Sequence, residues 1–211
     1  PPEESELDTN ANSAPPQKPW ALWAALTLVA GGAIALVYVL LVASSKPETQ
    51  QGLSRFAMGE MARLYVEDAP PPMPARALRD AAGNETTLAA YRGQVVVLNL
   101  WATWCAPCME EMPSLAVLQR NFAGRIAVVP ISVDSEGERD KAISELRRLS
   151  GGSLPFLQDM TRGVLFDAQA VGMPVTIIYN RQGQEIARLA GGANWGSEDA
   201  SRLIEAVLAE Q

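Results

Sequence analysis

The chain has only two cysteines, Cys105 and Cys108, and they lie between an apolar run and an amphipathic one. Residues 95–101 read Val-Val-Val-Leu-Asn-Leu-Trp, a composition typical of a strand buried on both faces of a sheet. After Cys108, large apolar side chains recur at helical spacing up to Phe122. The pattern predicts a first buried strand, followed by a helix that begins at the cysteine pair.

Beyond a proline-rich stretch that ends at Pro74, strand and helix patterns alternate. Two more β-branched runs, residues 126–133 and 175–179, predict buried strands, and a charged helix is predicted at 136–149. The turn sequence at 180–183 indicates a hairpin into a further strand, followed by a C-terminal amphipathic helix. The fold class predicted from these elements is α/β, with a mixed sheet and helices on both of its faces.

The N-terminal third of the chain is predicted to form no part of this domain. Residues 1–19 are acidic and rich in proline, which predicts a disordered tail. Residues 20–43 carry no charge and, as a helix, reach about 36 Å, which exceeds a hydrocarbon core of about 30 Å. We therefore predict a transmembrane anchor at 20–43, an amphipathic stem or linker at 44–69 and a folded domain at 70–211.

Flanking charges do not fix the orientation of this anchor, because a long domain that follows a span crosses the membrane largely regardless of charge.

Composition excludes several kinds of chemistry. The absence of histidine excludes Ser-His-Asp and Cys-His nucleophile pairs and histidine-ligated zinc. A net charge of −7 argues against nucleic-acid binding, because phosphate recognition requires a basic face. A single cysteine pair supplies no structural disulfide framework, and we find no phosphate loop or nucleotide motif. We therefore predict no organic cofactor.

The position of each cysteine predicts its role. Cys105 falls near the N-cap of the predicted helix, where free N–H groups and the helix dipole lower the pKa of a thiol. Pro107 lies in the first turn, where its missing N–H costs nothing. Cys108 comes one turn later and can attack a mixed disulfide formed at Cys105. We predict a redox-active pair in which Cys105 is the exposed nucleophile and Cys108 the resolving thiol.

Two other functions fit part of this pattern. Two thiolates and a methionine sulfur bind Cu(I), so a copper carrier that uses Cys105, Cys108 and Met173 is an alternative. A closed zinc site requires four ligands, and the chain has no second cysteine pair, so no resident metal is predicted. A peroxidase of the peroxiredoxin type ranks last. The peroxidatic and resolving cysteines of such enzymes are separated, which does not match the adjacent Cys105 and Cys108 of this chain. An anaerobic copper titration distinguishes the carrier from the redox enzyme.

Three stretches carry a family resemblance. Residues 99–113 read Asn-Leu-Trp-Ala-Thr-Trp-Cys-Ala-Pro-Cys-Met-Glu-Glu-Met-Pro, residues 172–175 read Gly-Met-Pro-Val, and a Gly-Gly-Ala-Asn-Trp-Gly run follows Ala190. In these stretches the chain resembles the thioredoxin superfamily, specifically its membrane-tethered TlpA-like branch, over about residues 70–210. The resemblance implies a thioredoxin fold with a central insertion, here between Asp134 and Val171, preceded by one N-terminal transmembrane helix.

The resemblance also implies an activity and a location. It implies a thiol:disulfide oxidoreductase of the bacterial inner membrane, single-pass, whose C-terminal domain lies in the periplasm and whose tail at 1–19 is cytoplasmic. Such proteins act as dithiol reductants of disulfides in apo-cytochrome c or in copper-site assembly proteins of the oxidases. The implied partners are these substrates, a membrane electron donor of the DsbD/CcdA type and membrane lipid. The only redox group implied is the Cys105–Cys108 disulfide.

Residues around the pair take their expected roles from the same resemblance. Trp104 immediately precedes the pair in the matching motif. Met173 and Pro174 match the cis-proline loop that faces the pair. Glu111 matches an acid near the active site, where it would relay a proton to or from Cys108. The alternative for Glu111 is a solvated acid in the first turns of the helix.

Two neighbouring positions complete the predicted site. Glu110 is expected to face solvent. Asn99 stands where thioredoxin itself has a buried aspartate, and because an amide does not titrate, we predict a hydrogen-bonded core amide there.

Overall fold

The computed structural model describes residues 19–44, 52–67 and 69–210. The chain divides into two compact units, Pro1–Lys46 and Pro47–Gln211. In the first unit, α1 (Pro19–Ser44) is a helix of 26 residues. Within the part of the chain that the structure describes, no helix combines the length and the apolar character needed to cross a bilayer. The anchor at 20–43 stays a prediction, and the tail at 1–19 lies outside the described residues except for Pro19.

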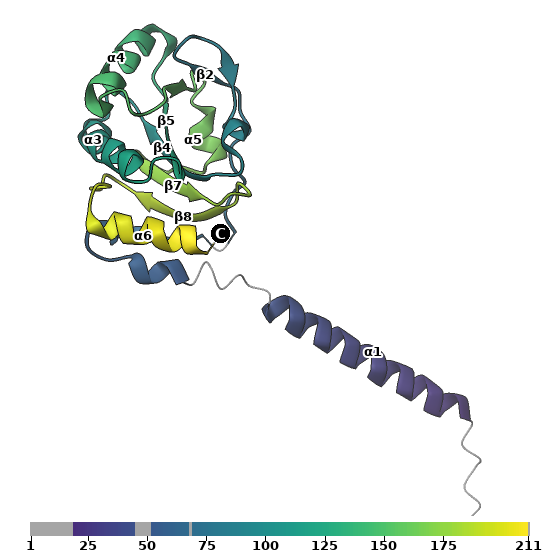
Figure 1. Cartoon of the computed structure of the whole chain (residues 1–211). Helices are drawn as coiled ribbons and strands as arrows, with labels where there is room; N and C mark the ends of the chain where they lie inside the picture. The colour runs from purple at the N-terminus through teal and green to yellow at the C-terminus, as the bar shows by residue number, and fades with distance from the viewer. Residues whose placement is uncertain (1–18, 45–51, 68, 211) are drawn as a thin grey trace, which may run out of the picture. The chain divides into compact units, whose positions relative to one another are not determined.

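The second unit is built on a mixed sheet of eight strands with the order β1-β8-β7-β4-β5-β6-β2-β3 (Figure 1). The central strand β4 pairs in parallel with β5 and antiparallel with β7. The strands are β1 (Leu64–Tyr65), β2 (Leu78–Asp80), β3 (Glu85–Thr86), β4 (Val95–Trp101), β5 (Ile126–Ser132), β6 (Leu157–Gln158), β7 (Val175–Tyr179) and β8 (Glu185–Ala190).

Helices cover both faces of this sheet, as the sequence predicts. In Figure 1, α3 and α4 lie side by side, and α5 lies on the other side of β4 and β5. The helices of this unit are α3 (Ala106–Asn121), α4 (Arg139–Ser150), α5 (Gly163–Asp167) and α6 (Glu198–Ala209). Short 3-10 helices are η1 (Ser54–Phe56), η2 (Gly59–Met61), η3 (Leu88–Tyr91) and η4 (Glu136–Glu138). The thioredoxin-like α/β fold is confirmed.

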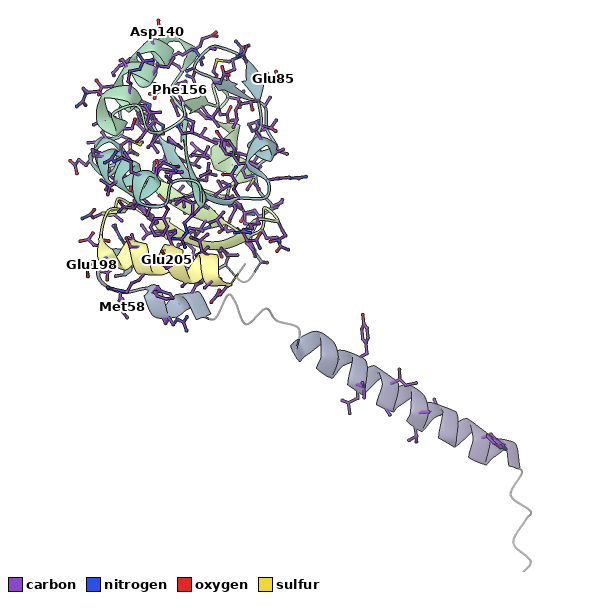
Figure 2. All side chains as sticks on the ribbon, in the orientation of Figure 1. Met58, Glu85, Asp140, Phe156, Glu198 and Glu205 are labelled. Atoms are coloured by element: carbon purple, nitrogen blue, oxygen red, sulfur yellow. A yellow bond between two sulfur atoms is a disulfide. The ribbon has the colours of Figure 1, made fainter. Side chains whose placement is uncertain are left out.

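The core lies between the sheet and its helices. Strands β4, β5 and β7 are buried along their whole length, which confirms the prediction from their continuous β-branched runs. Figure 2 shows Phe156 inside the side-chain packing, whereas Met58 and Glu198 are at the surface. The insertion predicted between Asp134 and Val171 contributes one short strand to the sheet, β6.

The folded unit begins well before the predicted boundary at residue 70, and this corrects the assignment of 44–69 as a stem or linker. Leu53 and Met61 are fully buried, and β1 pairs with β8. Two 3-10 helices and a short strand lie within residues 54–65, where a stem or linker was predicted. The physical reason is that β1 covers the edge of β8, whose backbone groups would otherwise be unpaired.

Truncating Met61 tests whether this segment belongs to the cooperative unit. We expect Met61→Ala to lower the free energy of unfolding by about 2–5 kcal/mol, because it removes a fully buried side chain and leaves a cavity. The control is Met58→Ala, at a position 56% exposed, which should change stability by less than about 0.5 kcal/mol. Urea unfolding of the full chain measures both. Equal midpoints for Met61→Ala and wild type would show that residues 52–67 do not stabilise the domain.

Candidate active site

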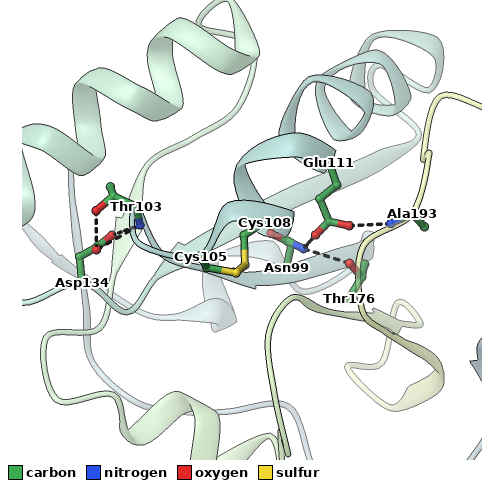
Figure 3. The surroundings of a disulfide bond; sticks show 8 residues. All are labelled: Asn99, Thr103, Cys105, Cys108, Glu111, Asp134, Thr176 and Ala193. Atoms are coloured by element: carbon green, nitrogen blue, oxygen red, sulfur yellow. Dashed lines mark hydrogen bonds between the residues drawn. A yellow bond between two sulfur atoms is a disulfide. The ribbon is translucent and has the colours of Figure 1, made fainter.

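Cys105 and Cys108 are joined in a disulfide at the start of α3, with their Cα atoms 5.3 Å apart (Figure 3). Cys105 is the N-cap residue of α3, and Pro107 lies in the first turn, as the sequence predicts. Cys108 is fully buried and Cys105 is 7% exposed. Cys105 is therefore the more accessible of the two cysteines. The prediction that its side chain is exposed is wrong for the oxidised protein, in which its sulfur is bonded to the buried Cys108.

The loop that leads to the cysteine pair carries an exposed aromatic ring and is hydrogen-bonded to a buried carboxylate. Trp104 is 53% exposed, and the guanidinium carbon of Arg162 lies 5.7 Å from its ring centroid. Asp134 is fully buried and accepts hydrogen bonds from the backbone N–H of Thr103 at 3.0 Å and from its hydroxyl at 2.9 Å (Figure 3). The Ser132 hydroxyl donates to the same carboxylate at 2.9 Å. Asp134 thus holds the loop that leads to Cys105.

Asp134 is not among the site residues predicted from the sequence, although its position after a buried strand is a signal. Asp134 follows β5, the parallel neighbour of β4, and parallel strands present their carboxyl ends at the same edge of a sheet. The cysteine loop leaves β4 at that edge. A polar residue just after the next parallel strand is therefore a candidate to hold the loop.

The Met173–Pro174 peptide bond is cis, which confirms the expectation from the matching loop. Val175, the first residue of β7, is paired with Leu100 of β4. This register places Pro174 at the sheet edge where the cysteine loop starts.

Glu111 is buried rather than solvated, which excludes the alternative of a solvated helix acid. It is 4% exposed, and its carboxyl accepts hydrogen bonds from the Asn99 side-chain amide at 2.7 Å and from the Ala193 N–H at 3.1 Å (Figure 3). Asn99 also donates to the Thr176 hydroxyl at 3.0 Å, so the predicted core amide is confirmed. Glu110 is exposed, as expected.

Burial has the largest effect on the pKa of Glu111. Desolvation raises the pKa of its carboxyl from the ordinary 4.5 to about 7, against the opposing hydrogen bonds from Asn99 and Ala193. Glu111 follows Cys108 by three residues, so the two side chains share one face of α3. An acid with a pKa near neutrality beside a buried thiol is suited to exchange a proton with it.

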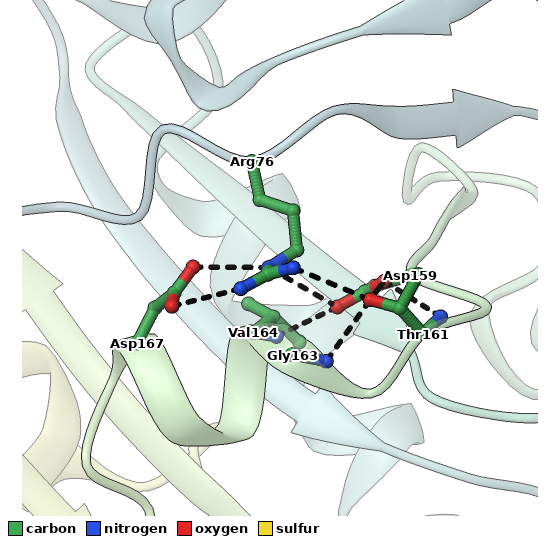
Figure 4. A network of polar contacts seen from close by, with 6 residues as sticks. All are labelled: Arg76, Asp159, Thr161, Gly163, Val164 and Asp167. Carbon is green, nitrogen blue, oxygen red and sulfur yellow. Dashed lines mark hydrogen bonds and ion pairs between the residues drawn. The ribbon is translucent and has the colours of Figure 1, made fainter.

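A polar network holds the segment that leads to the cis-proline loop (Figure 4). The Arg76 guanidinium donates two hydrogen bonds of 2.9 Å to Asp167 on α5 and lies 3.7 Å from Asp159. Asp159 in turn accepts from the Val164 N–H at 2.6 Å. Arg188, which is buried and paired with Glu185, donates to the Ala168 carbonyl at 3.1 Å. Part of the predicted insertion is therefore fixed to the domain on two sides.

No group of three or more His, Cys, Asp or Glu side chains is placed to hold a metal ion among the residues that the structure describes.

Comparison with known proteins places these features among thiol-disulfide proteins. Residues 71–186 match the model of the AhpC/TSA family. Thioredoxin-like protein YneN of Bacillus subtilis is 32% identical over 106 residues, which cover 50% of this chain and 62% of YneN. The chain thus spans less than two thirds of that relative. Thiol-disulfide oxidoreductase ResA of Geobacillus kaustophilus is 31% identical over 132 residues, which cover 62% of this chain and 72% of ResA.

Among solved structures, a Chlorobium tepidum protein assigned as a thiol:disulfide interchange protein DsbE superimposes with a TM-score of 0.59 at 25% identity. The superposition covers 67% of this chain and 98% of that protein.

The raised pKa of Glu111 predicts a pH-dependent stability. Because the folded state holds this proton up to about pH 7 and the unfolded state releases it near pH 4.5, wild type loses stability as the pH rises between these values. The free energy of unfolding of Glu111→Gln, relative to that of wild type, should therefore rise by up to about 3 kcal/mol from pH 4.5 to pH 8. Any effect of the substitution that does not depend on pH leaves this rise unchanged.

Urea unfolding of the oxidised protein across this pH range measures the difference. Glu110→Gln, at the exposed neighbouring position, is the control and should change stability by only a few tenths of a kcal/mol. A difference between Glu111→Gln and wild type that stays constant with pH would contradict a buried acid that titrates near neutrality.

Proposed function

The chain belongs to the AhpC/TSA family of thioredoxin-like proteins, and from that membership we propose that it is a thiol:disulfide oxidoreductase acting as a dithiol reductant of protein disulfides. The observation that carries the proposal is the Cys105–Cys108 disulfide at the N-terminus of α3, with the buried acid Glu111 one turn further along. The relative ResA, itself named a thiol-disulfide oxidoreductase, supports this reaction class.

The reaction begins at Cys105 in the reduced protein. Its position at the helix N-cap favours the thiolate, and it is the more accessible of the two cysteines. The thiolate attacks one sulfur of the substrate disulfide, a mixed disulfide forms at Cys105, and the other substrate sulfur leaves as a thiolate that takes up a proton.

Resolution requires Cys108 to lose its proton. Glu111, on the same face of α3, accepts that proton when its carboxyl is ionised. The Cys108 thiolate then attacks the Cys105 sulfur and re-forms the disulfide that the structure contains, and the second substrate sulfur leaves as a thiolate that takes up a proton. Two electrons have passed from the cysteine pair to the substrate, and a dithiol donor must return two electrons and two protons.

The residues between the cysteines favour the reductant direction. Ala106 and Pro107 carry no charge, and the chain has no histidine that would stabilise the nucleophilic thiolate. Glu111 adds a carboxyl rather than a cation beside Cys108. Because a stabilised thiolate is what makes such a pair oxidising, this pair should be reducing.

The location and pathway form the finer part of the proposal. We place the protein in the bacterial inner membrane through the uncharged run at 20–43, with the C-terminal domain in the periplasm. Its substrates are disulfides of apo-cytochrome c or of copper-site assembly proteins, and its electrons come from a membrane donor of the DsbD/CcdA type. The relatives named ResA and DsbE support this assignment, and the Cys105–Cys108 disulfide is the only redox group that it requires.

Single-cysteine variants test the assigned roles. Cys108→Ser should still attack substrates through Cys105 but fail to resolve them, so substrate proteins stay attached through a disulfide that dithiothreitol cleaves. The matched variant Cys105→Ser should trap far less, because Cys108 is fully buried. Non-reducing gels of cells that carry each variant compare the adducts, and mass spectrometry identifies the trapped proteins.

Two results would overturn this proposal. Adducts on Cys105→Ser but none on Cys108→Ser would reverse the assigned roles. Adducts on neither variant, together with tight stoichiometric Cu(I) binding by wild type, would favour a copper carrier instead.

A further inference from the structure

The first segment of the folded unit contacts the loop that covers Glu111. The Glu60 side chain accepts a hydrogen bond from the Asn194 N–H at 3.2 Å, and the Glu60 N–H donates to Asp199 at 3.1 Å. Close by, the Arg63 guanidinium donates to the carbonyl of Gly192. Residues 59–63 are therefore attached to the loop at 191–194 by side-chain and backbone contacts.

This loop in turn lies directly against the Glu111 carboxyl. The Ala193 N–H donates to Glu111 Oε2 at 3.1 Å. A Cβ atom added at Gly192 would lie 3.4 Å from the Pro107 carbonyl oxygen and 3.9 Å from Glu111 Oε2. At Gly191, where φ is +81°, an added Cβ would meet the Arg63 guanidinium at 2.5 Å. The loop is thus confined between Arg63 on one side and the first turns of α3 on the other.

The same residues surround a cavity of about 570 Å³. Its walls include Glu60 and Arg63 from the segment, Glu110 and Glu111 from α3, and Gly192 and Asn194 from the loop. Among the described residues that line it, Arg63 is the only cation. The nearly buried carboxyl of Glu111 therefore borders a cavity whose one positive charge comes from a segment more than 40 residues earlier in the chain.

We propose that Arg63 is a positioning residue for Glu111. It fixes the 191–194 loop through the Gly192 carbonyl, which keeps the Ala193 N–H on the carboxyl, and it supplies a positive charge to the shared cavity. The segment at 59–63 is in this way part of the active site rather than a tether for it. The consequence for thiol chemistry rests on the proposed function, but the effect on Glu111 does not.

The charge environment of Glu111 makes the direction of the effect clear. The Glu111 carboxyl accepts from Asn99 of β4, which also donates to Thr176 of β7; neither residue carries a charge, and the covering loop at 191–194 is uncharged as well. Glu110 and Glu60 are exposed at the cavity. Desolvation raises the pKa of Glu111, and the positive charge of Arg63 lowers it. Removing its charge should therefore raise this pKa further.

The test follows the Glu111 carboxyl itself. The full chain in its oxidised form is labelled with ¹³C at the glutamate carboxyl carbons, and the Glu111 signal is assigned by its loss in Glu111→Gln. Its NMR shift is then titrated in wild type, Arg63→Met, Arg63→Lys and the control Arg55→Met. Arg55 lies in η1, ahead of the 59–63 segment, with its guanidinium carbon 5.0 Å from the Phe56 ring centroid.

We expect Arg63→Met to raise the titration midpoint of Glu111 by about half a pH unit, the size typical of a partly screened charge pair. Arg63→Lys, which keeps the charge and a donor, and Arg55→Met should titrate like wild type. Arg63→Gln carries the same expectation as Arg63→Met and replaces it if that variant fails to fold.

Three outcomes would overturn the proposal. These are an unchanged midpoint in Arg63→Met, an equal shift in Arg63→Lys, and an equal shift in Arg55→Met. Because no substrate or reductant is present, these results stand apart from any failure of the proposed oxidoreductase activity.

Discussion

The burial of one carboxyl group, that of Glu111, is the constraint on which the rest of this site depends. An acid removed from water is costly unless it is neutral or hydrogen-bonded. The structure meets this cost with the Asn99 amide on the central strand and the Ala193 N–H on the covering loop. An aspartate in place of Asn99 would put a second carboxyl against the first, where two like charges repel. The uncharged amide of Asn99 is thus the partner that a buried Glu111 requires.

The sheet topology brings the remaining parts of the site together. Strands β4 and β5 are parallel, so the cysteine loop and Asp134 leave the sheet at the same edge. Strand β7 runs antiparallel to β4 and begins at that edge, directly after Pro174. Three segments distant in sequence therefore meet around the disulfide with no dedicated scaffold beyond the sheet itself.

Some of this could be predicted from the sequence, because the signals are local. The buried strands follow from continuous β-branched runs, and the cap position of Cys105 follows from its place before a helical pattern. The bond between Asp134 and Thr103 depends on which strands are neighbours, which one sequence does not reveal. Residues 52–67 were misassigned because spaced apolar side chains fit a free amphipathic helix as well as a strand that pairs with β8.

We propose that this pair delivers electrons as a dithiol, because Ala106 and Pro107 carry no charge and the chain has no histidine to stabilise the thiolate further. The most direct measurement is the reduction potential of the Cys105–Cys108 disulfide at pH 7, by equilibration of the full chain with glutathione or dithiothreitol buffers. We expect a value closer to the roughly −270 mV of thioredoxin than to the roughly −120 mV of a strong oxidant. A potential near −120 mV would contradict this proposal.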